Sequence, residues 1–399
     1  MQTTNRPSET SAFHTAAAAR TVGTRICTRC VMDASDPTIS FDPEGVCNHC
    51  LAYDRIHREL PTGEVAAERL RTIVAGIKRD GVGKPYDCII GVSGGVDSTY
   101  VAYRVKELGL RPLAVHLDNG WNSEIAVSNI SKALTTLGID LQTHVIDWEE
   151  FKDIQRAFLL ASTPDAEIPS DHAIFTLLYR QATRLGLRHI VTGLNVRTET
   201  HLPAAWSQGH WDFGYIRAVH RQFGSGRIKT FPHFNFYDYV TGKRHTHTAV
   251  NVLDYMDYAK KEALVVLQRQ LGWKDYGGKH FENVYTRWFQ GCYLPRKFGF
   301  DKRRSHLSSR LCSGEITRAE ALSELAHPPY PVAQQQADCE YVAKKLSFSA
   351  EAFSAVMAAP LRQFHDYPSY HRVAQSAGFK RFMRAYQFFK YDLLRRSRR

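Results

Sequence analysis

The sequence lacks any long apolar segment: no run in its 399 residues approaches the roughly 18 apolar side chains that span a bilayer. A membrane-spanning helix is therefore excluded. Residues 1–24 are polar and rich in Ala and Thr, without an apolar signal core, so we expect a disordered leader and a cytoplasmic protein. With 43% hydrophobic and 23% charged residues, the composition fits a soluble protein with a substantial core. It excludes collagen-like, coiled-coil and wholly disordered chains.

Acidic residues are scarce at the C-terminal end of the chain. Residues 372–399 contain nine Lys and Arg side chains and one acid, Asp392, and so contribute +8 of the net charge of +12. The rest of the chain is nearly balanced. A basic end of this kind can bind phosphate, RNA or an acidic protein, or keep a protein soluble, so charge alone selects none of these functions.

Short apolar runs alternate with helix-compatible stretches from residue 86 onward. We predict strands at residues 87–92, 111–118, 141–147 and 188–193. We predict helices at residues 98–108, 123–137, 149–160 and 171–185. This alternation favours an α/β fold with a doubly wound, mainly parallel sheet, whose ligands bind beyond the carboxyl ends of the strands.

We predict five regions along the chain: a leader (1–24), a cysteine-bearing unit (25–55), a linking helix (56–84), the alternating segment (85–250) and a mostly helical substrate or partner region with a basic tail (251–399). Apolar residues recur at helical spacing within residues 64–78, and the clearest later helices are at residues 260–271 and 318–325. The aromatic stretch at residues 231–240 is predicted as a strand whose aromatic side chains serve mainly core packing.

Four of the eight cysteines form a paired pattern. Cys27-x2-Cys30 is separated by sixteen residues from Cys47-x2-Cys50. Each pair points two thiolates at one ion, and two pairs complete the tetrahedral site that Zn²⁺ prefers. The spacing predicts a zinc ribbon with a structural ion, because a closed four-ligand site has no open position for substrate; an Fe–S cluster is the alternative. We expect a short β segment at residues 38–41 and no chemical role for the other cysteines.

A glycine-containing loop ends the first predicted strand. Its residues, all candidates for ATP binding, are Ser93, Gly94, Gly95, Val96, Asp97 and Ser98. Two glycines let the backbone approach a phosphate, and the N–H groups that start the next helix point at it. Asp97 would repel phosphate directly, so we expect it to hold Mg²⁺ against the phosphate oxygens. The loop matches neither the G-x-G-x-x-G nor the G-x-x-x-x-G-K-[ST] pattern, which disfavours Rossmann and Walker sites.

Further candidates lie at the carboxyl edge of the predicted sheet. Asp118 and Trp121 follow the second strand, where a loop either lines a nucleotide or forms a capped turn. His172, near the start of a helix, is a weak candidate for substrate contact, because a lone histidine is more often structural.

Basic side chains cluster with aromatic ones in residues 277–313. Positive charge there would offset a triphosphate and its leaving pyrophosphate, and Lys279 and Lys302 are the favoured contacts. Arg296 is a weaker candidate for substrate contact. The alternative for these residues is a solvated basic face without a site.

The sequence SGGVDS after a first strand resembles the PP-loop of the ATP-pyrophosphatase superfamily, of the adenine nucleotide alpha-hydrolase-like fold. That superfamily includes GMP, NAD and asparagine synthetases and the tRNA thiolases. The resemblance implies cleavage of ATP between the α and β phosphates with Mg²⁺, and an adenylated intermediate that ammonia or a sulfur donor displaces. It also implies that Gly193 and Asn195, after the fourth strand, contact the adenine or ribose.

A longer series of motifs covers residues 26 to about 325. In order they are CTRCVMD, CNHC, SGGVDS, HLDNGWNSE, PSDHAIF, TGLNVRTE, WDFGYIRAVH, KTFPHFNFYDY and the stretch that begins GGKHFENVYTRWFQGCYLPRKFGFDKRR. This series is similar to the N-acetyl sugar amidotransferase family (WbpG/PseA-like) of surface polysaccharide biosynthesis. The resemblance implies conversion of an acetamido group on a nucleotide-activated sugar to an acetamidino group, for lipopolysaccharide O-antigen or nonulosonic acid.

The sequence has no sign of a glutaminase of its own. It has no G-x-C-x-G nucleophile elbow, and Gln2 rather than a cysteine follows Met1. The resemblance implies a separate class I glutaminase subunit and a barrel subunit like the cyclase of histidine biosynthesis as the ammonia source. The alternative function is a PP-loop tRNA thiolase with a zinc ribbon, which requires sulfur-handling cysteines near the loop. Nucleic acid is the less favoured partner, and the sugar, its nucleotide carrier and the oligomeric state stay open.

Overall fold

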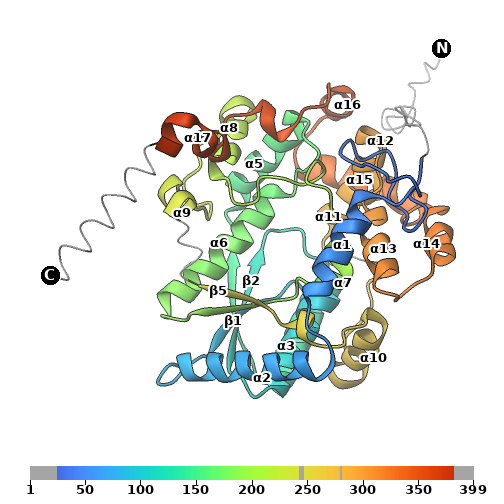
Figure 1. Ribbon diagram of the computed structural model, residues 1–399. Helices are drawn as coiled ribbons and strands as arrows, with labels where there is room; N and C mark the ends of the chain where they lie inside the picture. The colour runs from blue at the N-terminus through green and yellow to red at the C-terminus, as the bar shows by residue number, and fades with distance from the viewer. Residues whose placement is uncertain (1–24, 242–246, 279–280, 382–399) are drawn as a thin grey trace, which may run out of the picture.

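A five-stranded parallel sheet lies at the centre of the computed structural model, which describes residues 25–241, 247–278 and 281–381 (Figure 1). Its strands are β1 (Cys88–Gly91), β2 (Pro112–Asp118), β3 (Asp140–Val145), β4 (His189–Thr192) and β5 (Thr248–Asn251). They lie in the order β3-β2-β1-β4-β5, and every neighbouring pair is parallel. The chain winds from β1 first one way and then the other, which confirms the predicted doubly wound α/β sheet.

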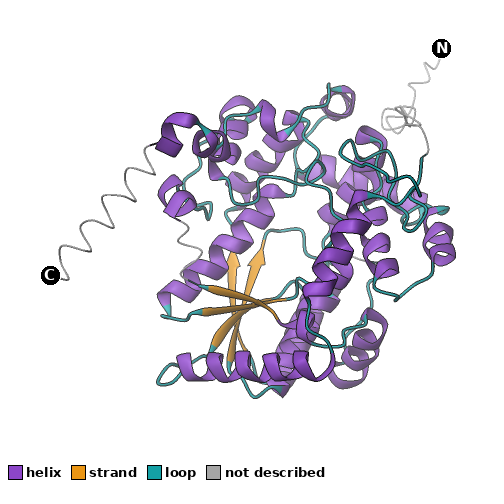
Figure 2. Ribbon diagram, in the orientation of Figure 1, coloured by secondary structure: helices purple, strands orange, loops and turns teal. Residues whose placement is uncertain are grey.

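Helices cover both faces of the sheet, as Figure 2 shows. One core contains residues of α2 (Gly63–Asp80), α3 (Val96–Glu107), α4 (Glu124–Leu137) and α10 (Lys260–Leu271). The other contains residues of α5 (Trp148–Ala161) and α6 (Ile168–Arg184). Successive strand side chains point to opposite faces, so in β1 Ile90 enters the first core and Ile89 the second. Both are fully buried, as expected for the central strand of a parallel sheet.

The helices around the sheet lie where the sequence predicts them, and local sequence explains their ends. The side chains of Ser123 and Asp147 accept hydrogen bonds from backbone N–H groups in the first turns of α4 and α5. Gly138 ends α4 with a φ of 58°, a left-handed conformation that favours glycine.

Among the described residues, the chain after β5 contains only helices as regular elements, as predicted. They are, besides α10, η3 (Val252–Tyr255), α11 (Val284–Trp288), the π-helical turn η4 (Phe289–Tyr293), α12 (Leu294–Phe298), α13 (Arg303–Cys312), α14 (Arg318–Leu325), α15 (Val332–Lys345), α16 (Ala350–Ala358), η5 (Phe364–Asp366) and α17 (Tyr370–Gln375). Other helices precede them: α1 (Asn48–Glu59), α7 (Val196–Glu199), α8 (Phe213–Phe223) and α9 (Phe236–Thr241). No helix in this described part of the chain is long and apolar enough to cross a membrane.

Two predicted strands are wrong. Residues 231–235 have no regular structure and are followed by α9, because the Asn235 side chain accepts a hydrogen bond from the Asp238 N–H and starts a helix there. Phe231 and Phe234 of this stretch are buried, in agreement with their predicted role in packing. Residues 38–41 form only an isolated bridge, between Phe41 and Cys47.

The cysteine-bearing unit packs against α13 and α14 (Figure 1). The Arg318 guanidinium donates hydrogen bonds to the carbonyl oxygens of Cys27 and Cys30, at 3.0 and 3.2 Å. Arg304 donates to the Val31 carbonyl oxygen at 2.7 Å. The unit is therefore joined to the C-terminal helices through its own backbone.

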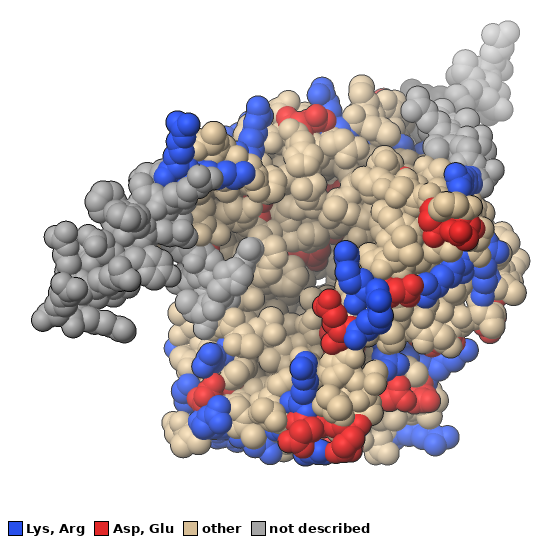
Figure 3. Space-filling view, in the orientation of Figure 1, with Lys and Arg blue, Asp and Glu red and all other residues tan. Residues whose placement is uncertain are grey.

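Charges of both signs are mixed on the face seen in Figure 3, where Lys and Arg side chains alternate with Asp and Glu over α2. An exposed example is the pair of carboxylates, Glu64 and Glu68, that flanks Arg71. This agrees with the nearly balanced charge of the chain before its basic tail, most of which lies outside the described residues.

Candidate active site and metal centre

The loop after β1 is shaped by Gly94. Its φ is 81°, a left-handed conformation that glycine adopts without strain. A Cβ here would lie 2.6 Å from the carbonyl oxygen of Ala126, so the loop can approach α4 this closely only without a side chain. The Trp273 indole Nε1 donates a hydrogen bond of 3.1 Å to the Gly94 carbonyl oxygen. The loop is therefore held from two sides before α3 begins.

Hydroxyl and N–H groups gather at the start of α3. The Ser98 Oγ accepts a hydrogen bond from the Ser93 N–H at 3.2 Å, and the Gly95 N–H donates to the Ser93 Oγ at 3.3 Å. Ser93 is exposed. Because these groups lie at the positive end of a helix dipole, the loop can bind an anion of the phosphate type.

Asp97 lies in the first turn of α3, where its Oδ1 accepts a hydrogen bond from the Tyr258 hydroxyl. Burial raises the pKa of Tyr258, and the Asp97 charge raises it further, so the phenol keeps its proton and donates it. Tyr276 and Glu282 lie beside the same loop, because a Cβ on Gly95 would be 3.4 Å from the Tyr276 hydroxyl and 3.0 Å from the Glu282 Oε1. A neutral donor therefore orients the Asp97 carboxylate at the loop.

The loops after β2 and β4 lie on either side of this loop, because β1 lies between those two strands. A Cβ on Gly193 would be 3.2 Å from the carbonyl carbon of Asp97, so the loop after β4 touches the start of α3. The Asn195 side chain is buried and caps α7. The Asp118 Oδ1 accepts a hydrogen bond of 2.9 Å from the Gly120 N–H. The sheet brings these predicted residues to one edge, and their contact with ATP stays a prediction.

Next to the loop lies a cleft of about 510 Å³, within the range of about 300–1,000 Å³ found for small-molecule sites. Val96 of the loop, Thr198 of α7 and Tyr276 contribute to its lining. Its basic lining residues are Lys260, Lys261, Lys302, Arg303, His306, Arg310 and His327, and its acidic ones are Asp275, Glu315 and Glu324. Basic groups outnumber acids, which suits a ligand that carries phosphate.

Lys302 is the predicted basic residue that reaches this cleft. Its Nζ lies 3.4 Å from the Glu167 Oε2, and both side chains are largely buried. Burial opposes the charge of Lys302, but the carboxylates around it, first Glu167 and then Asp165, outweigh burial and raise its pKa. The ammonium group therefore stays charged beside the cleft.

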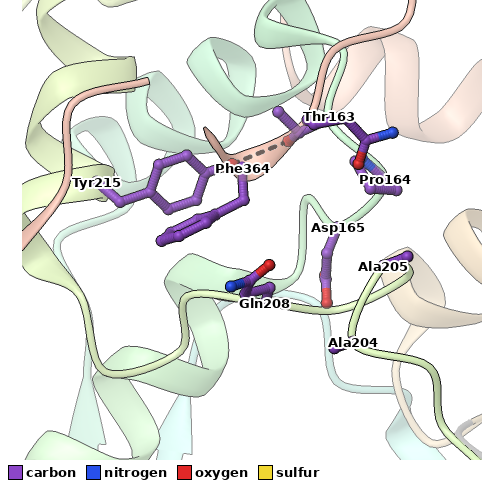
Figure 4. A pocket seen from close by; sticks show the side chains of 9 residues that line it. Thr163, Pro164, Asp165, Ala204, Ala205, Gln208, Tyr215 and Phe364 are labelled. Carbon is purple, nitrogen blue, oxygen red and sulfur yellow. Dashed lines mark hydrogen bonds between the residues drawn. The ribbon is translucent and has the colours of Figure 1, made fainter. Parts of the chain in front are cut away.

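A second cavity lies between Tyr215, Phe364 and the Thr163–Asp165 turn (Figure 4). The Tyr215 hydroxyl donates a hydrogen bond of 3.2 Å to the Thr163 Oγ1 across one side of it. Its volume of about 10 Å³ admits at most about one water molecule. The larger cleft is therefore the candidate site.

Residues 282–385, which contribute Thr286, Gln290 and Lys302 to the cleft, match the family model of the C-terminal domain of WbpG-like LPS biosynthesis proteins. This C-terminal segment is therefore WbpG-like.

The chain is also similar to the tRNA-specific 2-thiouridylase MnmA of Helicobacter acinonychis (strain Sheeba), with 30% identity over 118 residues. That match covers 27% of the chain and 34% of the relative, so the chain spans about a third of the length of this curated relative. A similar solved structure is NMN synthetase from Francisella tularensis, with 17% identity and a TM-score of 0.26. The match covers 52% of this chain and 87% of the synthetase.

The four paired cysteines converge as predicted. Their sulfur atoms lie within 4.8 Å of one another, and all four residues are fully buried. The Cys30 and Cys47 Sγ atoms are 3.6 Å apart, and those of Cys27 and Cys50 are 4.0 Å apart. A tetrahedral ion with metal–sulfur bonds of about 2.3 Å has sulfur–sulfur edges of about 3.8 Å. The cluster can therefore hold a metal ion and is consistent with a zinc ribbon.

Other predicted residues lie away from the cleft. Trp121 is buried, and its Nε1 donates a hydrogen bond of 2.7 Å to the Gln155 Oε1. His172 is fully buried, and burial lowers its pKa to about 4, so its ring is neutral. Both placements favour a structural role and count against substrate contact. Arg296 is exposed and does not line the cleft. Lys279 lies outside the described residues.

Several residues at the loop are absent from the sequence-based list of candidates: Tyr258, Trp273, Tyr276 and Glu282. They belong to a segment that closes over the loop, since Asn129 of α4 exchanges two hydrogen bonds of 2.8 Å with the backbone of Lys274. Their position depends on tertiary contacts across more than a hundred residues. No spacing within the segment could have indicated it.

Proposed function

We propose that the chain is an ATP-dependent amidotransferase that converts an acetamido group of a nucleotide-activated sugar into an acetamidino group. The observation that carries this proposal is that one residue of the SGGVDS loop, Val96, lines the same cleft as Lys302 and Arg303 of the WbpG-like segment. One cleft can then take both ATP and the sugar nucleotide.

The first step joins the sugar to AMP. The acetamido oxygen attacks the α phosphorus, the bond to the β phosphate breaks, and pyrophosphate leaves while the amide N–H loses its proton. The N–H and hydroxyl groups of Ser93 and Ser98 would bind the departing phosphates at the start of α3. The charged Lys302 would offset the negative charge that develops there. Mg²⁺ held by the Asp97 carboxylate would neutralise phosphate oxygens.

The second step replaces oxygen with nitrogen. Ammonia adds to the imidate carbon and loses a proton, and the carbon–oxygen bond breaks as AMP leaves. Adenylation is needed because the amide oxygen is otherwise a poor leaving group. The residues of the cleft would hold the imidate away from water while ammonia arrives.

The four-cysteine cluster supports a structural zinc ion in this enzyme. Four buried thiolates complete the coordination of Zn²⁺ and leave no position for substrate. The ion would fix the turns that carry the carbonyl oxygens of Cys27 and Cys30, to which Arg318 donates hydrogen bonds. The ion would thereby support the packing of α13 and α14 against the cysteine-bearing unit.

Mass spectrometry tests the reaction. We expect incubation with ATP, Mg²⁺, ammonium and UDP- or CMP-linked acetamido sugars to lower the mass of one sugar nucleotide by about one dalton, with release of AMP, because an oxygen is replaced by NH. Omission of ATP is the control and should leave every mass unchanged. AMP release on transfer RNA, with no mass change in any sugar nucleotide, would contradict the proposal.

A partner supplies the ammonia in this proposal. Cys292 is buried, and its contact with Cys339, together with burial, raises its pKa, so it is unsuited to attack glutamine. The partners would be a class I glutaminase subunit and a barrel subunit like the cyclase of histidine biosynthesis. We expect glutamine to support turnover only when both subunits are added, whereas ammonium supports it without them. Glutamine-dependent turnover by the purified chain alone would overturn this part of the proposal.

The second candidate, a tRNA thiolase, is favoured by the partial similarity to MnmA. It requires a cysteine that carries sulfur to the adenylated base. None of the eight cysteines lines the cleft, and Cys88 is buried inside β1. The amidotransferase therefore explains the site better.

A further inference from the structure

A third thiol lies against the four-cysteine cluster. The Cys312 Sγ is 3.8 Å from the Cys50 Sγ and 3.6 Å from the His201 Nε2. These three residues come from the C-terminal end of α13, from α1 and from the turn after α7. Segments distant in sequence therefore bring two sulfurs and an imidazole nitrogen within 4.8 Å of one another.

The distances match those of a coordinated metal. With metal–sulfur bonds of about 2.3 Å and metal–nitrogen bonds of about 2.0 Å, tetrahedral angles give edges of about 3.8 Å between sulfurs and about 3.5 Å between sulfur and nitrogen. The Cys50–Cys312 and Cys312–His201 separations lie within about 0.1 Å of these edges. Two thiols that only shared a hydrogen bond would not require a histidine nitrogen at a third corner of a coordination tetrahedron.

The tautomer of His201 also suits a metal ligand. The Ser309 hydroxyl donates its single hydrogen to the Ser305 carbonyl oxygen at 3.2 Å and accepts from the His201 backbone N–H at 3.1 Å. With the hydroxyl hydrogen on that carbonyl, its contact of 3.0 Å with the His201 Nδ1 is an N–H donated by the ring. This arrangement leaves the lone pair of Nε2 facing Cys312. Metal-binding histidines are held in this way by a partner on the other nitrogen.

We propose that Cys50, Cys312 and His201 bind a second Zn²⁺ ion, with the Cys50 thiolate bridging it to the ion of the four-cysteine cluster. Cys50 and Cys312 bind as thiolates, and the Cys312 proton passes to solvent. Two ions with five thiolates and a neutral imidazole carry a net charge of −1, compared with −2 for one ion with four thiolates. The second ion therefore lowers the buried negative charge.

The second ion would connect the cleft to the cysteine-bearing unit. Arg303, His306 and Arg310 of α13 line the cleft, and Cys312 ends the same helix. Thr198 of α7 lines it too, and His201 lies three residues further along. One ion would therefore fix two helices of the cleft against α1.

Metal content tests the proposal on the full chain, without any activity measurement. We expect two zinc ions per chain after purification with Zn²⁺ and gel filtration, and one in Cys312→Ser and in His201→Gln. Cys339→Ser removes a buried thiol that belongs to neither group and should keep two ions. One ion in the unmodified chain, or two in Cys312→Ser, would overturn the proposal.

NMR of the cadmium-substituted protein covers the case in which the variants fail to fold. A shared Cys50 thiolate predicts two cadmium resonances in the unmodified chain, coupled to each other through that sulfur. A single resonance of the four-sulfur type would show that Cys312 and His201 share only a thiol–imidazole hydrogen bond, which is the alternative outcome and counts against the second ion.

Discussion

Replacement of Asp97 by asparagine is expected to lower ATP-to-AMP turnover by about two to three orders of magnitude. The amide has nearly the same shape and can still accept the hydrogen bond from the Tyr258 hydroxyl, so the loop should keep its conformation. What is lost is the negative charge that would hold Mg²⁺ against the phosphates. Pyrophosphate release with saturating ammonium measures the effect.

Asp257→Asn is the matched control, because it removes a carboxylate from the residue next to Tyr258, the hydrogen-bond partner of Asp97. The Asp257 side chain is 98% exposed and pairs only at the surface, with Arg197 at 3.1 Å. We expect its turnover to stay close to that of the unmodified chain, since exposed pairs contribute little. Unchanged turnover in Asp97→Asn would remove Asp97 from the mechanism and contradict the amidotransferase and the thiolase alike.

The sheet could be predicted from the sequence because its signals are local. The runs that form β1, β2 and β4 are apolar over several residues, and each is followed by a helical pattern. The edge strand β5 is short and contains two exposed residues, Thr248 and Ala249, so it has no comparable apolar run. It forms because it pairs with β4, which only the folded chain provides.

The candidate site divides in the same way. The loop from Ser93 to Ser98 is one contiguous segment, and the order of its glycines and hydroxyl residues is enough to indicate a phosphate-binding loop. The residues that cover it, such as Tyr258, reach it from 161 positions away. Trp121 and His172 were predicted from their places beside a strand and a helix start. Their burial depends on aromatic neighbours such as Tyr285 and Phe231, which no local pattern reveals.

Loss of one cysteine ligand is expected to have the largest effect on stability. In Cys47→Ser we expect the metal of the four-cysteine cluster to be lost, because three thiolates and a hydroxyl bind Zn²⁺ far more weakly than four thiolates. Structural zinc contributes about 10–16 kcal/mol of binding free energy in small zinc-binding units, and that energy supports their folding. A loss of even several kcal/mol should lower Tm by on the order of 10 °C in a chain of this size.

The Tm and the zinc content of Cys47→Ser should therefore fall together. Cys339→Ser is the control, and it should keep its zinc content and a Tm close to that of the unmodified chain.

Loss of the metal should also affect the cleft. Without the metal, the turn of Cys27 and Cys30 cannot hold the carbonyl oxygens that Arg318 binds, and Val31 leaves its contact with α13. Because α13 contributes Arg303 to the cleft, we expect the turnover of Cys47→Ser to be reduced even at temperatures at which the chain is still globally folded. Full zinc content and an unchanged Tm in Cys47→Ser would exclude a structural metal at this cluster.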